Sequence, residues 1–138
     1  MTRFVLDASV TLAWLIDRET PPYAMRVRHL LLTGSRALVP ALWQWEIANG
    51  FVVSERRGVL KPSETAEILH DFEVVRAAIE IKPEVASIPR VIAAARENGL
   101  TAYDAAYLDL AYEQQMPIAT LDRVLVKAAN RAGVPLLS

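Results

Sequence analysis

The stretch RFVLDASVTLAWL, residues 3–15, indicates a buried strand that leads directly into a helix. Residues 4–6 are apolar and favour a short strand, and a helix-like apolar run follows from Ser9. Asp7 stands at the junction. Burying an unpaired carboxylate costs several kcal/mol. Asp7 therefore either caps the helix or faces a positively charged partner, and this stretch alone leaves both readings open.

The rest of the chain repeats this alternation. Expected strands span residues 3–6, 37–39, 78–81, 117–120 and 134–137. Expected helices span residues 9–16, 22–33, 42–57, 63–77, 84–98, 102–115 and 123–132, with Ser63 and Thr101 as N-caps. This order predicts a single α/β domain over residues 1–138, with a parallel sheet of about four to five strands and helices on both faces. The helices that flank residues 58–62 are expected to form a projecting hairpin.

Composition narrows the function classes. The hydrophobic content of 53% exceeds the usual ~45–50% and indicates a partner surface in addition to a core. No apolar run approaches the ~18 residues of a membrane span, and no signal peptide is expected, so the cytoplasm is the expected compartment. Without cysteine there are no disulfides or thiolate metal sites. With 15 basic and 16 acidic residues, nucleic-acid binding would need a local basic patch.

Four acidic residues stand out by their positions. Asp7 and Asp122 each follow an expected strand, and the carboxyl ends of parallel strands form the usual site of such sheets. Glu46 and Asp104 lie on apolar helices. Each residue also has a structural reading: Asp7 and Asp122 as helix caps, Asp104 as a stabilising acid near a helix N-terminus, and Glu46 as an exposed helix residue.

Taken together, the four acids indicate a metal site. Carboxylates that share a pocket raise one another's pKa values unless a cation compensates them. Oxygen ligands favour Mg²⁺ or Mn²⁺ over zinc. His29 and His70 lie inside expected helices, far from the acidic motifs, and are expected to be surface or packing residues.

Four motifs resemble those of the PIN-domain family, and of VapC-type toxins in particular. They are VLDASV at residues 5–10, WEIAN at 45–49, LTAYDAAYLDLA at 100–111 and IATLD at 118–122. The family places acids after the first strand, on a mid-chain helix, in a T-x-x-D-A-x-Y-like segment and in a T-x-D-like segment. These positions match Asp7, Glu46, Asp104 and Asp122, and the resemblance extends over essentially the whole chain.

The resemblance implies an endoribonuclease that uses one or two Mg²⁺ or Mn²⁺ ions, cleaves RNA and so inhibits translation and growth. Asp7 and Asp104 are the expected direct ligands, while Glu46 and Asp122 would ligate, hold waters or orient the nucleophile. Further candidates are supporting residues and phosphate contacts. The supporting residues are Ser9, Asn49 and Thr120, and the phosphate contacts are Arg18, Arg123 and Lys127.

The family also implies protein partners. A cognate VapB-type antitoxin is expected to place a segment in an apolar groove near Trp14 and Trp43, with a basic side chain among the acids. Homodimerisation is common in the family. Trp14, Trp43 and Trp45 could instead stack on RNA bases, although packing is the expected role.

Two other functions are compatible with parts of the sequence. A phosphohydrolase of the haloacid dehalogenase type also has an Asp after its first strand, but it normally needs a second acid two residues later, where this chain has Ser9. A catalytically silent PIN-like binding module would keep the fold without needing all four acids. Metal-dependent RNA cleavage separates this module from a nuclease.

Overall fold

The computed structural model describes residues 2–83 and 87–138. Its sheet has four parallel strands in the order β3-β2-β1-β4. They are β1 (Arg3–Leu6), β2 (Arg36–Pro40), β3 (Ile79–Lys82) and β4 (Ile118–Ala119). The strand interiors are apolar because helices cover the sheet on both faces, as the sequence predicted.

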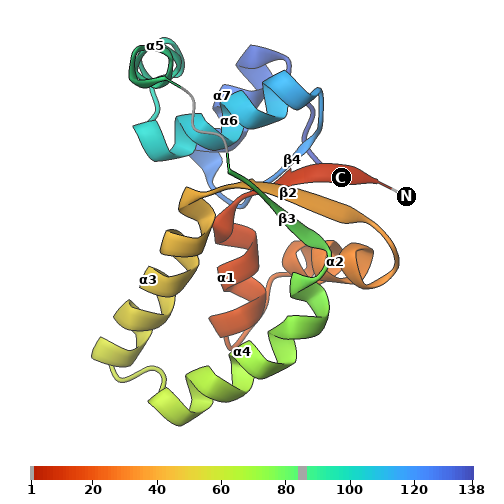
Figure 1. Cartoon of the computed structure of the whole chain (residues 1–138), viewed down its shortest axis with the longest axis vertical. Coiled ribbons are helices and arrows are strands. Elements are labelled where there is room, and N and C mark those ends of the chain that lie inside the picture. The colour runs from red at the N-terminus through yellow and green to blue at the C-terminus, as the bar shows by residue number, and fades with distance from the viewer. Residues whose placement is uncertain (1, 84–86) are drawn as a thin grey trace.

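The helices form two layers around this sheet. Helices α1 to α4 lie below the sheet in Figure 1, and α5 to α7 lie above it. The first layer consists of α1 (Ala8–Ile16), α2 (Pro22–Leu32), α3 (Leu42–Arg56) and α4 (Pro62–Arg76). The second consists of α5 (Ile88–Asn98), α6 (Ala102–Gln114) and α7 (Arg123–Ala132). Among the described residues, no helix is both long and apolar enough to cross a membrane.

The register of the central strands places two chain segments side by side. Leu6 of β1 pairs with Ala119 of β4, and the Asp7 backbone N–H donates to the Ala119 carbonyl at 3.0 Å. The residues that follow these strands, Asp7 and Thr120, therefore emerge together at one edge of the sheet.

A close contact between α1 and α3 fixes the position of α3 relative to α1. Gly50 of α3 packs against Leu12 of α1 so closely that a Cβ on Gly50 would run into the Leu12 side chain. Glu46 lies one turn before Gly50 on the same helix. The missing side chain at Gly50 therefore lets α3 bring Glu46 toward the start of α1.

The predicted hairpin corresponds to α3 and α4, which extend away from the sheet (Figure 1). Residues 57–61 join the two helices at the end of the hairpin that is distant from the sheet. The hydroxyl of Thr65 on α4 donates to Glu55 Oε2 on α3 at 2.7 Å.

The predicted cap at Ser63 is wrong, because Lys61 occupies the N-cap position and Pro62 opens the helix. Proline is favoured at the first helical position, and Glu64 accepts from the Lys61 backbone N–H at 2.9 Å.

The chain's last segment departs from the prediction too. Instead of a strand over residues 134–137, only an isolated parallel bridge joins Ile118 to Leu136. The partner strand β4 is only two residues long, so it offers little edge for pairing. The predicted start of a helix at Glu84 lies outside the described residues, and α5 begins at Ile88 with Ser87 as its cap.

Other expectations about single residues are met. Thr101 caps α6 by accepting from the Asp104 backbone N–H. Both histidines, His29 and His70, are exposed. The buried side chains form one contiguous core, in which Trp43 and Tyr107 are the largest fully buried residues.

Candidate active site

Asp7 is buried and does not cap the helix that follows it. Only 4% of the residue is exposed, and although Asp7 occupies the N-cap position of α1, its side chain makes no capping hydrogen bond. Instead Oδ2 accepts from the Ser9 hydroxyl at 2.6 Å and from the Thr120 hydroxyl at 2.8 Å. The capping interpretation of Asp7 is therefore wrong, and its carboxylate is held at the sheet edge by two neutral donors.

These two hydroxyl groups are themselves oriented by the backbone. Ser9 Oγ accepts from the Leu121 N–H at 3.1 Å, and Thr120 Oγ1 accepts from the Asp122 N–H at 3.0 Å. Because each oxygen already receives a backbone hydrogen, its own proton is directed at Asp7. The roles predicted for Ser9 and Thr120, as donors to a carboxylate, thus have a structural basis.

The last acid of the set, Asp122, does cap its helix. Its Oδ1 accepts from the backbone N–H groups of Val124 and Leu125 at 2.9 and 3.4 Å. Its other carboxylate oxygen accepts no hydrogen bond from the described residues. The capping interpretation is correct for Asp122, and one oxygen still remains available for a ligand.

Glu46 is half-buried and is held by a tyrosine. The hydroxyl of Tyr107, on α6, donates to Glu46 Oε1 at 2.6 Å. Burial raises the pKa of Glu46, the Tyr107 hydrogen bond lowers it in part, and the charges of Asp7 and Asp104 raise it further. Glu46 therefore lies within electrostatic reach of both other acids.

Asp104 belongs to the same electrostatic group. Burial is the main cause of its raised pKa, followed by the charges of Asp122 and Asp7, while a hydrogen bond with Thr101 lowers it. The pKa of Asp7 is raised mainly by burial and also by Asp122, against the two hydroxyl hydrogen bonds. The structure thus brings together acids from β1, α3, α6 and the start of α7.

The group has no internal cation. Within the described part of the chain, no lysine, arginine or histidine lowers the pKa of Asp7, Glu46 or Asp104. A cation would relieve their repulsion, and an oxygen-only set suits Mg²⁺ or Mn²⁺. The donor chemistry therefore fits such an ion. In their present orientations, however, no three described His, Cys, Asp or Glu side chains are gathered closely enough to hold a metal directly.

The remaining predicted residues lie in different places. Asn49 is exposed and makes no hydrogen bond with the described residues, although it is on the same helix as Glu46. Arg123 and Lys127 are exposed on α7, directly after Asp122. Arg18 follows the far end of α1, which is roughly 14 Å of helix from Asp7 at 1.5 Å per residue. Arg18 is therefore not brought beside the acids.

The tryptophans divide into three environments. Trp43 is buried, with its ring 6.3 Å from that of Phe72, which agrees with the expected packing role. Trp14 is partly buried, and its indole N–H has no hydrogen-bond partner in the part of the chain that the structure describes. Trp45, next to Glu46, is 80% exposed.

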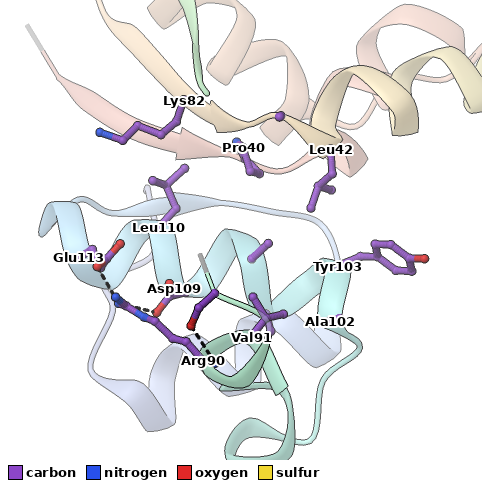
Figure 2. Close-up of a pocket in the computed structure, with 14 residues that line it drawn as sticks. Pro40, Leu42, Lys82, Arg90, Val91, Ala102, Tyr103, Asp109, Leu110 and Glu113 are labelled. Carbon is purple, nitrogen blue, oxygen red and sulfur yellow. Dashed lines mark hydrogen bonds and ion pairs between the residues drawn. The ribbon is translucent and has the colours of Figure 1, made fainter. Parts of the chain in front are cut away.

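A separate hollow is lined by residues next to Asp104 but by none of the four candidate acids. A cavity of about 660 Å³ opens between the ends of β2 and β3 and the helices α5 and α6. Figure 2 shows Arg90 on its wall, paired with Asp109 at 3.1 Å and with Glu113 at 2.7 Å. Tyr103, next to Asp104, also lines it. Asp109 and Glu113 thus serve as surface ion-pair partners.

Tyr107 is the site residue that the sequence analysis did not single out. It lies on the same face of its helix as Asp104, three residues earlier. The signal was the tyrosine that ends the T-x-x-D-A-x-Y-like segment. Its contact with Glu46 joins residues 61 positions apart, which a local pattern does not reveal.

Comparison with known proteins agrees with this fold. A PIN-domain family model matches residues 4–131. Ribonuclease VapC3 from Pyrobaculum aerophilum is 28% identical over 125 residues, which cover 91% of this chain and 93% of the relative. The structure of PAE2754 from P. aerophilum has a TM-score of 0.69 at 23% identity and covers 92% of this chain and 79% of its own. FitAcB from Neisseria gonorrhoeae has a TM-score of 0.63 at 17% identity, with 100% and 97% covered. Because the family model spans most of its length, the chain belongs to the PIN-domain family.

Proposed function

We propose that this protein is a Mg²⁺- or Mn²⁺-dependent endoribonuclease, a VapC-like toxin that cleaves RNA and so inhibits translation and growth. The observation that carries the proposal is Asp7: a buried carboxylate that caps no helix, is repelled by neighbouring acids and meets no cation among the described residues. A fold does not retain such a group for stability, because burying it is unfavourable. The similarity to Ribonuclease VapC3 supports the same reaction class.

Each acid has a distinct role in this proposal. Asp7 and Asp104 would hold the cation directly or after small side-chain adjustments, and Glu46 and the free oxygen of Asp122 would ligate it or hold its waters. A bound divalent cation supplies a water of lowered pKa and offsets charge on the scissile phosphate. Ser9 and Thr120 both donate to Oδ2 of Asp7, so that its other carboxylate oxygen would be left for the ion.

Phosphate contacts are assigned to α7. Arg123 and Lys127 lie one turn apart on the helix that Asp122 caps, and both are exposed. Their positive charge beside a cluster of acids favours an anionic polymer that approaches along this helix. Arg18 is left out of the site because it does not lie near the acids. Asn49 is exposed and would contribute only through a bridging water.

A VapB-type antitoxin is the proposed partner. A hollow of about 180 Å³ between α1, α2 and α4 is lined by Trp14, Leu15, Arg28, Ile68, Asp71, Phe72 and Val75. The unpartnered Trp14 N–H there would donate to a peptide carbonyl. Trp14 lies two turns from Asp7 on α1, roughly 10 Å at 1.5 Å per residue. A basic side chain on a peptide in this hollow would thus be able to reach the acids and neutralise them.

Homodimerisation in the cytoplasm remains part of the proposal. Helix α5 has no buried residue, and Ile88 and Ile92 on it are 77% and 47% exposed. Exposed apolar residues of this kind indicate a surface that another protein covers.

The two alternatives differ in what they would require. The haloacid dehalogenase reading is disfavoured because Ser9, in the place of its second acid, serves as a hydrogen-bond donor to Asp7. A catalytically silent binding module would have no need of a buried carboxylate at Asp7 that caps no helix.

The decisive experiment is sequencing of RNA 5′ and 3′ ends after brief expression of the chain. Expression of the wild type should produce new ends at defined sites together with growth arrest, whereas Asp7→Asn should produce neither. Asp17→Asn is the matched control, because Asp17 is an exposed acid at the other end of α1. An identical set of RNA ends with and without wild-type expression would refute the nuclease proposal.

A further inference from the structure

Tyr107 combines complete burial with a polar contact to the acid group. Its exposed fraction is 0%, and its hydroxyl makes the 2.6 Å hydrogen bond to Glu46 Oε1. A buried phenol needs a hydrogen-bond partner, and Glu46 supplies it. The pair is therefore a fixed feature of the folded chain.

The phenol lies where three acid-bearing elements meet. Its own helix, α6, carries Asp104 one turn earlier. Its partner Glu46 lies on α3. Burial is the main cause of the raised pKa of the phenol, the hydrogen bond and charge of Glu46 and the charge of Asp7 raise it further, and the backbone of Ala8, directly after Asp7, lowers it in part. The net effect keeps the phenol protonated, so it serves as a hydrogen-bond donor.

The contact also restricts what Glu46 can do. With Oε1 engaged by Tyr107, the orientation of the carboxyl group is set and Oε2 is the oxygen left for other partners. Without the donor, Glu46 would be free to rotate. A half-buried carboxylate repelled by Asp7 and Asp104 would then turn away from both.

We infer that Tyr107 is a positioning residue, whose hydroxyl holds Glu46 in the orientation from which its second carboxylate oxygen would serve a divalent cation among the acids. The inference rests on the proposed function for the identity of the ion. It goes further in assigning a role to a residue that touches neither the ion nor the RNA. Groups that orient metal ligands in this way typically contribute about 10–100-fold to metal affinity or activity.

The test is Tyr107→Phe, which removes one oxygen and keeps the buried ring. Tyr112→Phe is the matched control, since Tyr112 lies on the same helix and is 65% exposed. For each purified protein, Mn²⁺ binding is measured by calorimetry and by the rise in melting temperature, and RNA cleavage is measured across Mn²⁺ concentrations. Tyr107→Phe should remain folded and bind Mn²⁺ about 10-fold more weakly or worse, while Tyr112→Phe should match the wild type.

A double-variant comparison separates positioning from general support of the fold. In a Glu46→Gln background the carboxylate is already gone, so adding Tyr107→Phe should reduce Mn²⁺ affinity no further. If Tyr107→Phe lowers the melting temperature of the metal-free protein but leaves Mn²⁺ affinity unchanged, the residue is only structural and the inference is wrong. An equal loss in both backgrounds would overturn it as well.

Glu46→Asp covers the case in which Tyr107→Phe does not fold. It keeps the charge but withdraws the carboxylate by one methylene, out of reach of the hydroxyl, and the same weakening of Mn²⁺ binding is expected. Undiminished binding would overturn the inference. Because binding is measured apart from cleavage, a wild type whose Mn²⁺ affinity depends on Tyr107 and Glu46 but which cleaves no RNA would refute the proposed function and leave the positioning role standing.

Discussion

Replacing Asp7 by Asn should abolish RNA cleavage while leaving the metal-free protein as stable as the wild type or slightly more stable. Both hydroxyl donors converge on one oxygen, Oδ2, at 2.6 and 2.8 Å. An Asn carbonyl oxygen in that position would accept both hydrogen bonds. The substitution therefore keeps the shape and both hydroxyl contacts, removes the charge and replaces the second oxygen by an NH₂ group.

The expected stability change is a difference between two opposing effects. A buried, uncompensated carboxylate costs several kcal/mol, and charge-assisted hydrogen bonds recover about 1.5–3 kcal/mol each. The raised pKa of Asp7 means that the unfavourable effects of burial and of Asp122 are the larger. We expect a net gain on the order of 1 kcal/mol, which for a domain of this size corresponds to about 3–5 °C in melting temperature.

Catalysis should respond in the opposite direction. Losing a direct ligand removes charge stabilisation that acts at the scissile phosphate, so cleavage should fall at least about 100-fold. The rise in melting temperature on adding Mn²⁺ should shrink as well, because a ligand stabilises the folded state according to its affinity.

The assay combines melting curves in EDTA and in Mn²⁺ with cleavage of a labelled single-stranded RNA. The control is again Asp17→Asn, the same chemical change on an exposed acid of α1. Cleavage by Asp7→Asn within a few-fold of wild type would remove Asp7 from the mechanism. A loss of many degrees in EDTA would instead contradict the electrostatic argument.

Other perturbations test the same site from different directions. Asp104→Asn should reduce the Mn²⁺-induced rise in melting temperature and cleavage together, and equal rises in wild type and variant would count against Asp104 as a ligand. Burial raises the pKa values of Asp7, Glu46 and Asp104 above 3.8–4.5, so the folded state holds protons more tightly than the unfolded one. Metal-free stability should therefore fall as pH rises from about 4 through the raised values, and melting curves in EDTA that instead rise with pH would refute this. Gly50→Ala should lower the free energy of unfolding by about 1–3 kcal/mol through overpacking against Leu12. In a Leu12→Ala background, the same Gly50→Ala substitution should carry no such penalty in denaturant unfolding.

The convergence of the acids was predictable because it follows from topology. Parallel strands deliver their carboxyl ends to one edge, so a strand-end acid such as Asp7 or Asp122 is placed by the sheet itself. Acids on apolar helices, such as Glu46 and Asp104, were identified because burial of an unpaired charge is unfavourable. These arguments need only the order of elements, which the sequence pattern supplies.

The orientation of each side chain was not predictable in the same way. Asp7 and Asp122 both precede helices, yet only Asp122 caps one. The difference arises from Thr120, whose hydroxyl binds an acid 113 positions away. Sequence spacing carries no information on such a contact, and the capping alternative for Asp7 had to remain open.

Errors at element ends have local causes. The start of α4 was displaced from Ser63 because Pro62 at the first helical position and the Glu64 hydrogen bond to Lys61 outweigh a good cap residue. The last expected strand reduces to one bridge at Leu136 because β4 has only two residues to pair with.

The arrangement of the acids also gives a reason why a basic side chain of the proposed antitoxin would inhibit effectively. Burial and mutual repulsion raise the pKa values of Asp7, Glu46 and Asp104. Any cation that reaches these carboxylates therefore gains binding energy by relieving their repulsion. A metal ion and an arginine or lysine of the proposed antitoxin would therefore compete for the same carboxylates. Inhibition by such a residue should weaken as Mn²⁺ concentration rises, whereas inhibition by steric cover of the α7 phosphate contacts alone should not. Measuring antitoxin-peptide inhibition of RNA cleavage at low and high Mn²⁺ distinguishes the two, and an inhibition constant independent of Mn²⁺ would exclude direct neutralisation of the acids.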